Sequence, residues 1–248
     1  MQAQQGLVAI LDALGAARYS HREVMQFLKS RQMVLDLLHV KASVKIKHGE
    51  LTADAVTTFT FNDTVLIVCR TPLIPDLDDV EQFCLLLRKF MVDSLAQGIL
   101  FRGSLAVGQF YVDDDSNTVM GSAVTDAAAW YSAAEWVGIN ATPHASLVVQ
   151  ALLERNGVDI DRALVNYDVP FKNGTTLPLK ALNWPKAFFV KGLRPGGDQE
   201  NPRAKCLSLL TANGTPKGVE AKQFNSIAFF DHCVTLLKQQ QKTRRASP

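Results

Sequence analysis

The sequence predicts a mixed α+β fold, because segments with helical periodicity alternate with segments that have the pattern of β-strands. Residues 7–11 form a continuously apolar run, which is typical of a strand buried on both faces. Apolar side chains recur at helical spacing over residues 20–39 and again over residues 76–96. Between these two helices, residues 55–69 combine strand-forming residues with an Asn62-Asp63 turn and therefore predict a β-hairpin.

Further elements follow in the same alternation. We expect strands over residues 100–111, 118–120 and 138–142, and helices over residues 121–136 and 143–154. The order through residue 142 is then β, α, β, β, α, β, β, α, β, which favours a ferredoxin-like α+β sandwich. Later, residues 160–219 show scattered strands and many turns, and residues 219–241 predict a final helix.

This pattern divides the chain into a core and an extension. Residues 1–155, with their regular alternation of helices and strands, are predicted to form the core. Residues 156–248 predict a C-terminal α/β extension packed on the same domain, with a basic tail over residues 242–248 that we expect to be disordered.

Composition excludes several classes of protein. Hydrophobic content of 47% and charged content of 20% are ordinary for a soluble globular protein, and a net charge of +2 does not favour binding of nucleic acid. No stretch approaches the roughly 20 apolar residues that cross a membrane. The four cysteines lie far apart without a Cys-x-x-Cys pair, which predicts neither a structural zinc site nor disulfides. We therefore expect a cytoplasmic protein.

Two aspartates occupy positions suited to metal binding. Asp12 ends the first buried strand, and Asp63 lies in the hairpin turn, so both carboxylates meet at one sheet edge if these strands are neighbours. Mg²⁺ and Mn²⁺ prefer oxygen ligands and bind through one or two carboxylates together with substrate phosphates. Gly15 and the small residues around it would let backbone N–H groups approach such phosphates. Ordinary turn and capping roles also explain both aspartates.

Four ordered motifs resemble class III nucleotidyl cyclases. Asp12-Ala13-Leu14-Gly15 resembles the family signature Asp-Ile-x-Gly-Phe-Thr, and Phe61-Asn62-Asp63-Thr64-Val65 resembles its Gly-Asp hairpin. Residues 102–108 are similar to the Arg-x-Gly-Ile-His-x-Gly strand, although Gly103 is one position early. Residues 120–130 are similar to the Gly-x-x-Val-Asn-x-Ala-Ala-Arg-Leu helix. The resemblance covers residues 7–150 and rests on the ordered set, because each motif alone is degenerate.

The resemblance implies a catalytic mechanism and an assembly. Class III cyclases are head-to-tail dimers with shared active sites, which implies a homodimer here. Asp12 and Asp63 would hold two Mn²⁺ or Mg²⁺ ions per site, with the Ala13 carbonyl as a further ligand. The ribose 3′-hydroxyl would attack the α-phosphorus and diphosphate would leave. The nucleotide would also contact the segment after the first strand, namely Leu14, Gly15, Ala16, Ala17 and Arg18.

Several positions depart from the family pattern. Where adenylate cyclases have a Lys and an Asp that read adenine, this chain has Phe59 and Thr118, and guanylate cyclases have Glu and Cys there. The helix Asn that holds the ribose is Thr125, and the Arg that stabilises the transition state is Ala129. Arg18 and Lys191 are candidates for the missing cation, and the same residues also fit plain surface positions. Phe59 fits a core position equally well.

Stand-alone bacterial pyrimidine cyclases of the Pycsar anti-phage systems share this loss of the purine-reading residues. The resemblance to them implies conversion of UTP to cyclic UMP, a second messenger for a separate cyclic-nucleotide-responsive effector. CTP with cyclic CMP as the product remains open, because no residue decides between uracil and cytosine. Two other hypotheses are a non-catalytic cyclase-like module that binds a nucleotide and a purine cyclase with an unusual pocket.

Overall fold

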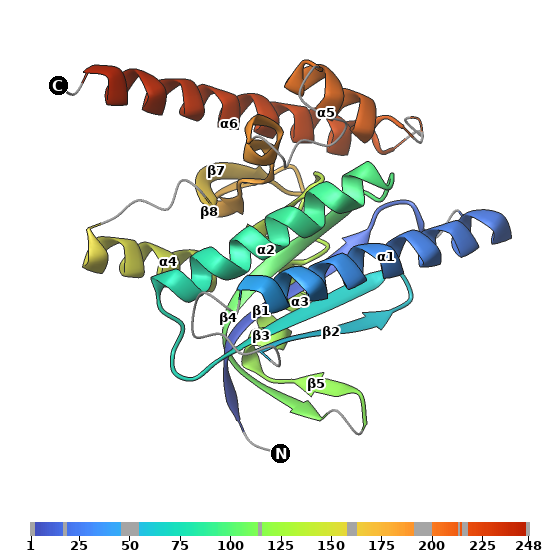
Figure 1. Cartoon of the computed structure of the whole chain (residues 1–248), viewed down its shortest axis with the longest axis vertical. Coiled ribbons are helices and arrows are strands. Elements are labelled where there is room, and N and C mark those ends of the chain that lie inside the picture. The colour runs from blue at the N-terminus through green and yellow to red at the C-terminus, as the bar shows by residue number, and fades with distance from the viewer. Residues whose placement is uncertain are drawn as a thin grey trace.

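The structure is a computed structural model that describes residues 3–16, 19–45, 55–113, 116–157, 163–190, 200–212, 214 and 218–246. Ala17, Arg18 and Lys191, which the sequence indicates as nucleotide-binding residues, lie outside the described residues. Figure 1 shows a central sheet with helices packed against it and the last helix, α6, running past the end of the sheet.

One sheet runs through both predicted parts of the chain. In spatial order its strands are β2 (Val56–Phe61), β3 (Thr64–Thr71), β1 (Gln4–Ala13), β4 (Phe101–Asp113), β6 (Gly138–Ala141), β8 (Thr176–Leu182) and β7 (Leu164–Pro170). The short strand β5 (Thr118–Met120) pairs with β4 off this path. The order β2-β3-β1-β4, with a helix after β1 and another after β3, is the ferredoxin-like arrangement and confirms the predicted fold class.

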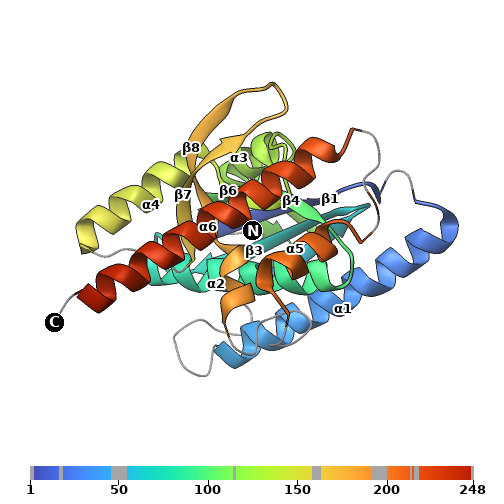
Figure 2. The same ribbon diagram turned by 90° about the horizontal axis from the view of Figure 1, so that it is seen from above.

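Helices cover the two faces of the sheet unequally. The helical segments are α1 (His21–Lys45), α2 (Leu77–Ala96), α3 (Ser122–Trp130), α4 (Pro143–Asn156), the 3₁₀-helix η4 (Trp184–Phe189), α5 (Pro202–Leu210) and α6 (Glu220–Ala246). Figures 1 and 2 show α1 and α2 lying together on one face, whereas the short α3 lies on the other. A capping box starts α1, because Ser20 N–H donates to Glu23 at 2.7 Å and Glu23 N–H donates back to the Ser20 hydroxyl at 3.4 Å.

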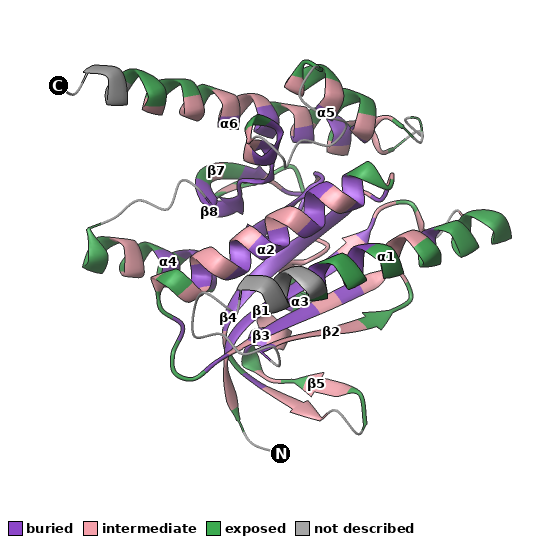
Figure 3. Ribbon diagram, viewed as in Figure 1, coloured by how far each residue is buried: buried purple, intermediate pink, exposed green. Residues whose placement is uncertain are grey.

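Alternating side chains of β1 serve two separate cores. Leu7, Ala9 and Leu11 are buried against the helices of the larger face, whereas Val8 and Ile10 are buried with Ala123 and Ala127 of α3. Around this second core, Phe59, Leu66 and Val112 are only partly buried. Figure 3 shows most of β2 in the pink of intermediate burial. Asp12 continues the series of Val8 and Ile10, so its side chain belongs to the α3 face of the sheet.

Three segments differ from the sequence-based prediction. The helix expected over 121–136 ends at Trp130, because the next residues leave the helix and Ala134 forms a β-bridge with Phe171. Helix α5 was not predicted; it is short and buries only Cys206 and Leu210. The tail expected to be disordered from residue 242 is helical as far as Ala246, since residues 239–246 are mostly good helix formers.

The described residues include no membrane-spanning helix and no reactive thiol. No helix among them combines the length and the apolar character needed to cross a membrane. All four cysteines are buried as free thiols, and burial raises the pKa of Cys69 to about 12, with the Asp79 carboxylate adding to the shift and Arg70 opposing it. Such a thiol stays protonated near neutral pH and behaves as a small apolar side chain.

Candidate active site

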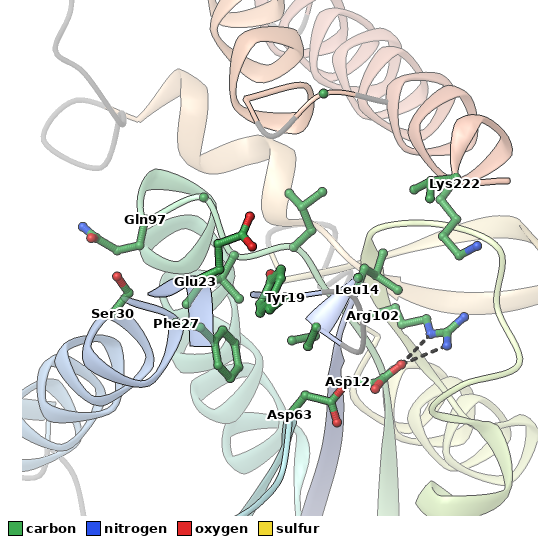
Figure 4. Close-up of a pocket in the computed structure, with 18 of the residues that line it drawn as sticks. Asp12, Leu14, Tyr19, Glu23, Phe27, Ser30, Asp63, Gln97, Arg102 and Lys222 are labelled. Carbon is green, nitrogen blue, oxygen red and sulfur yellow. Dashed lines mark hydrogen bonds and ion pairs between the residues drawn. The ribbon is translucent and has the colours of Figure 1, made fainter. Parts of the chain in front are cut away.

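A cavity of about 680 Å³ opens at the end of β1 and is lined by both predicted metal ligands, Asp12 and Asp63. Its walls come from the segment after β1, the start of α1, residues 97–100, the β7–β8 turn and the start of α6. Figure 4 shows the Asp12 and Asp63 carboxylates directed into the same space, with Tyr19 and Phe27 on one side and Arg102 and Lys222 on the other.

Strand pairing brings the two aspartates together. In the antiparallel β1–β3 pair, Asp12 lies opposite Thr64, the residue after Asp63. The backbone N–H of Ala13 donates to the Asp63 carbonyl at 3.1 Å, which fixes the hairpin turn against the end of β1. Asn62 takes φ 53° in this turn, a conformation that asparagine tolerates better than most residues. The predicted neighbouring position of these two strands is therefore confirmed.

Arg102 of β4 is the ion-pair partner of Asp12. It lies opposite Asp12 in the β1–β4 ladder, and its Nε and Nη2 donate to Asp12 Oδ2 at 3.1 and 2.9 Å. The neighbouring Gly103 allows this approach, because a Cβ there would lie 2.3 Å from the Ile10 carbonyl oxygen. Among the described residues, Asp12 Oδ1 and the Asp63 carboxylate have no hydrogen-bond or ion-pair partner, so both are free for a ligand.

Two lysines from the C-terminal extension also line the cavity. Lys172 lies in the β7–β8 turn, and Lys222 lies in the first turn of α6, where its Nζ is 2.6 Å from Glu135 Oε1. Burial lowers the pKa of Lys172, and the positive charges of Arg102 and Lys222 lower it further, whereas Glu135 and Asp12 oppose the shift. Lys172 is therefore close enough to be repelled by both Arg102 and Lys222, and an anionic ligand among these side chains would relieve the repulsion.

The donor set fits Mg²⁺ or Mn²⁺ bound together with phosphates. The described residues contain no group of three or more His, Cys, Asp and Glu side chains that could hold a metal ion. Two carboxylates are too few for the cages that bind Ca²⁺ or Zn²⁺. They match the ligand set of Mg²⁺, which keeps few protein ligands and takes further oxygens from substrate phosphates and water. Arg102, Lys172 and Lys222 supply the positive charge that such phosphates require.

The segment after β1 forms the remaining wall. Ala13, Leu14, Gly15 and Ala16 line the cavity as the resemblance implies, and the Leu14 N–H donates to the Leu100 carbonyl at 2.8 Å. Gly15 takes φ +86°, which other residues rarely adopt, so glycine permits the turn there. Tyr19 and Phe27 form a ring contact with centroids 5.7 Å apart beside this turn.

The predicted base-reading and ribose-binding residues are not among those that line this cavity. Phe59 lies on β2, opposite Leu66 in the ladder, and packs at the edge of the second core. Thr118 lies on β5, where its hydroxyl donates to the Ser116 carbonyl at 3.1 Å, and Thr125 and Ala129 are exposed on α3. Within one chain, the structure brings Asp12 and Asp63 together with the phosphate-side segment, but it keeps Phe59, Thr118 and Thr125 apart from them.

Sequence reasoning missed the cations from distant parts of the chain. Arg102 was visible only as part of a family motif, and Lys172-Asn173-Gly174 looked like an ordinary turn. The Lys172 side chain reaches the cavity because the segment 133–137 binds the β7–β8 turn, through Glu135 N–H to the Pro170 carbonyl at 2.8 Å and Lys172 N–H to the Ala133 carbonyl at 3.1 Å. Local sequence patterns do not predict such long-range hydrogen bonds.

Comparison with known proteins finds no matching family model and no matching curated protein. Among solved structures, the chain is similar to the catalytic core of a rhodopsin-guanylyl cyclase with converted specificity in complex with ATPαS, with 14% identity, a TM-score of 0.48, and coverage of 73% of this chain and 96% of that chain. It is also similar to the adenylyl cyclase CyaB from P. aeruginosa, with 15% identity, a TM-score of 0.41, and coverage of 73% and 93%. Both TM-scores are below 0.5, so the roles of the site residues rest on the geometry described above.

The charge cluster predicts a perturbed titration of Lys172. After reductive ¹³C-methylation, we expect the Lys172 NMR resonance, assigned with Lys172→Arg, to titrate at lower pH than the resonances of exposed lysines. Lys222→Met should raise the pKa of Lys172 by removing a repelling charge, whereas Glu135→Gln should lower it by removing an attracting one. Lys205→Met, remote from the cavity, is the control. A Lys172 resonance that titrates with the exposed lysines and ignores both substitutions would contradict this electrostatic picture.

Proposed function

We propose that this chain is a metal-dependent nucleotidyl cyclase that converts UTP to 3′,5′-cyclic UMP and diphosphate. The observation that carries the proposal is the convergence of the Asp12 and Asp63 carboxylates on one cavity that also holds Arg102, Lys172 and Lys222. A nucleoside triphosphate with divalent ions is the ligand whose charges match both groups. The ordered resemblance to class III cyclases supports the same reaction.

The side chains divide the work of the reaction. Asp12 and Asp63 would hold two Mn²⁺ or Mg²⁺ ions, with the Ala13 carbonyl as a further ligand, and bound ions of this kind activate the ribose 3′-hydroxyl and neutralise phosphate charge. The hydroxyl oxygen forms a bond to the α-phosphorus, the bond from the α-phosphorus to the bridging oxygen breaks, and the hydroxyl proton leaves to solvent. Arg102 and Lys172, which line the same cavity, would contact the phosphates and stabilise the charge that develops on the leaving diphosphate.

A homodimer with shared active sites would give a role to the predicted nucleotide-binding residues that lie away from the cavity. Among the described residues, α3 is the helix that covers the second core, and Phe61, which shares a strand face with Phe59, is 76% exposed. An apolar face of this kind favours association, and a two-fold dimer would place the same face of each chain on its partner. In such a dimer, Phe59, Thr118 and Thr125 of one chain would complete the cavity of the other.

The substrate base is inferred from what the chain lacks. Phe59 offers a ring for stacking and Thr118 one hydroxyl, where the purine cyclases have charged or thiol groups. The resemblance to the Pycsar pyrimidine cyclases favours UTP and a role in anti-phage signalling through a separate effector. CTP is the alternative substrate, because neither residue distinguishes uracil from cytosine.

A non-catalytic nucleotide-binding module is the second candidate function. Ala129 stands where the family has its transition-state Arg, and Arg102 already neutralises Asp12. The geometry of the two aspartates weighs against this candidate, because Asp12 Oδ1 and the Asp63 carboxylate have no hydrogen-bond or ion-pair partner among the described residues and are directed into one cavity, where they could hold a metal ion.

Product formation tests the proposed reaction. Purified protein is incubated with each of the four NTPs and Mn²⁺, and cyclic products are identified by mass spectrometry; we expect cyclic UMP from UTP. Asp63→Ala should lower turnover by about 100-fold or more, because it removes a metal ligand. Asp36→Ala, an exposed carboxylate of α1, is the matched control. No product from any NTP would contradict the enzyme, cyclic AMP alone would contradict the pyrimidine substrate, and an Asp63→Ala protein of undiminished activity would contradict the metal site.

Base selectivity tests Phe59. If its ring contacts the base, Phe59→Leu should change the ratio of kcat/KM between UTP and ATP by about tenfold, since one lost ring contact is worth about 1–3 kcal/mol. Leu66→Val is the matched control, because Leu66 packs in the same core opposite Phe59. The melting temperature of both variants is measured in parallel. If the two variants lose stability and activity alike, with the same ratio for all NTPs, Phe59 is only a core residue.

A further inference from the structure

We propose that Lys222 of α6 is a phosphate-binding residue of the active site and that Glu135 holds its ammonium group when no nucleotide is bound. This inference rests on the proposed function, because it takes the cavity ligand to be a polyphosphate. It assigns the C-terminal helix a direct part in substrate binding.

The C-terminal segment forms a wall of the cavity that holds Asp12 and Asp63. Besides Lys222, this wall consists of Gly214, Gly218, Val219 and Gln223. In Figure 4 the Lys222 side chain extends from α6 toward Arg102 and Asp12. The Lys222 and Glu135 side chains are 14% and 19% exposed, so their 2.6 Å ion pair is largely shielded from water. A shielded cation at this position interacts strongly with any anion in the cavity.

Other bonds hold the first turns of α6 in place without the Lys222–Glu135 pair. The Asn225 side chain donates to the Glu135 carbonyl at 2.7 Å, and the Ser226 hydroxyl accepts from the Val137 N–H at 2.7 Å. Gln223, which is 7% exposed, donates to the Leu210 and Gly214 carbonyls at 3.0 and 3.1 Å. Because these bonds already fix the backbone around Lys222, its ammonium group can exchange Glu135 for another anion while α6 stays docked.

The segment 133–137 joins Lys222 to the other cations of the site. Its Ala134 carbonyl accepts from Arg102 Nη1 at 3.5 Å, and its Ala133 carbonyl accepts from the Lys172 N–H at 3.1 Å. Burial lowers the Lys172 pKa, and the positive charges of Arg102 and Lys222 lower it further against the opposing charges of Glu135 and Asp12, so Lys172 lies within electrostatic reach of both cations. A triphosphate in the cavity would bring negative charge to all three cations, while divalent ions held by Asp12 and Asp63 would offset the carboxylates.

Binding of inorganic triphosphate tests the inference separately from catalysis. Isothermal titration in the presence of Mn²⁺ compares the wild-type protein with Lys222→Ala, Lys222→Arg and Glu135→Gln. We expect Lys222→Ala to raise the Kd about tenfold, as loss of one charge-assisted phosphate contact predicts, and Lys222→Arg to stay within about threefold of wild type. Glu135→Gln breaks the same ion pair but keeps the cation, so its Kd should be equal to or lower than that of wild type. For UTP turnover, Lys222→Ala should raise KM by a similar factor.

Controls separate phosphate binding from a structural role. Lys205→Ala removes a lysine that pairs with Glu200 at 3.2 Å on α5 and should leave triphosphate binding unchanged. Melting temperatures show whether α6 remains docked. If Lys222→Ala binds triphosphate like wild type, or if Lys222→Ala and Glu135→Gln weaken binding equally, the inference is overturned. If Lys222→Ala weakens triphosphate binding but no NTP gives a cyclic product, the inference stands and the cyclase is rejected. If a cyclic product forms and Lys222→Ala binds triphosphate like wild type, the cyclase stands and the inference is rejected.

Discussion

The ion pair between Asp12 and Arg102 determines how the rest of the site is arranged. It lies on the α3 face of the sheet, at the end of the two central strands, and Gly103 lets those strands approach closely enough to form it. One carboxylate oxygen of Asp12 is thereby neutralised, and the other faces the cavity with Asp63. Two carboxylates with unpaired oxygens beside an arginine fit a metal ion that brings anionic ligands of its own. In the proposed reaction, the Arg102–Asp12 pair would therefore join the metal-binding aspartates to the residues that contact phosphate.

The C-terminal extension adds further walls and positive charges to the cavity beside this ion pair. β7 and β8 continue the sheet beyond β6, and their turn carries Lys172 to the cavity. The segment 133–137 binds this turn on one side and α6 on the other, so positions far apart in sequence share one rigid junction. In the proposed reaction the extension would therefore be part of the functional unit, because Lys172 and Lys222 bring positive charge to the cavity that holds Asp12 and Asp63.

Local sequence patterns predicted the fold class, whereas the two aspartates were indicated by the ordered resemblance to class III cyclases and not by local pattern alone. The buried run of β1, the hairpin signal at Asn62-Asp63 and the helical spacing of apolar residues in α1 and α2 all act over a few residues, so they can be recognised without the structure. The pairing of Ala134 with Phe171 ended α3 early, which local periodicity does not reveal. Lys172 and Lys222 escaped prediction for the same reason, since only tertiary bonds bring them to Asp12. The roles of Phe59, Thr118 and Thr125 stay predictions that depend on a partner chain.

The most direct test of the account is to locate the metal. Crystals grown with Mn²⁺ and 3′-deoxyuridine 5′-triphosphate, which lacks the attacking hydroxyl, would be measured by anomalous diffraction at the manganese edge. If Asp12 and Asp63 hold two metal ions, two anomalous peaks are expected in the cavity at about 2.1 Å from oxygens of Asp12, Asp63 and the triphosphate, the distance expected for small divalent cations. Manganese bound elsewhere, or a triphosphate bound away from Asp12 and Asp63, would contradict it.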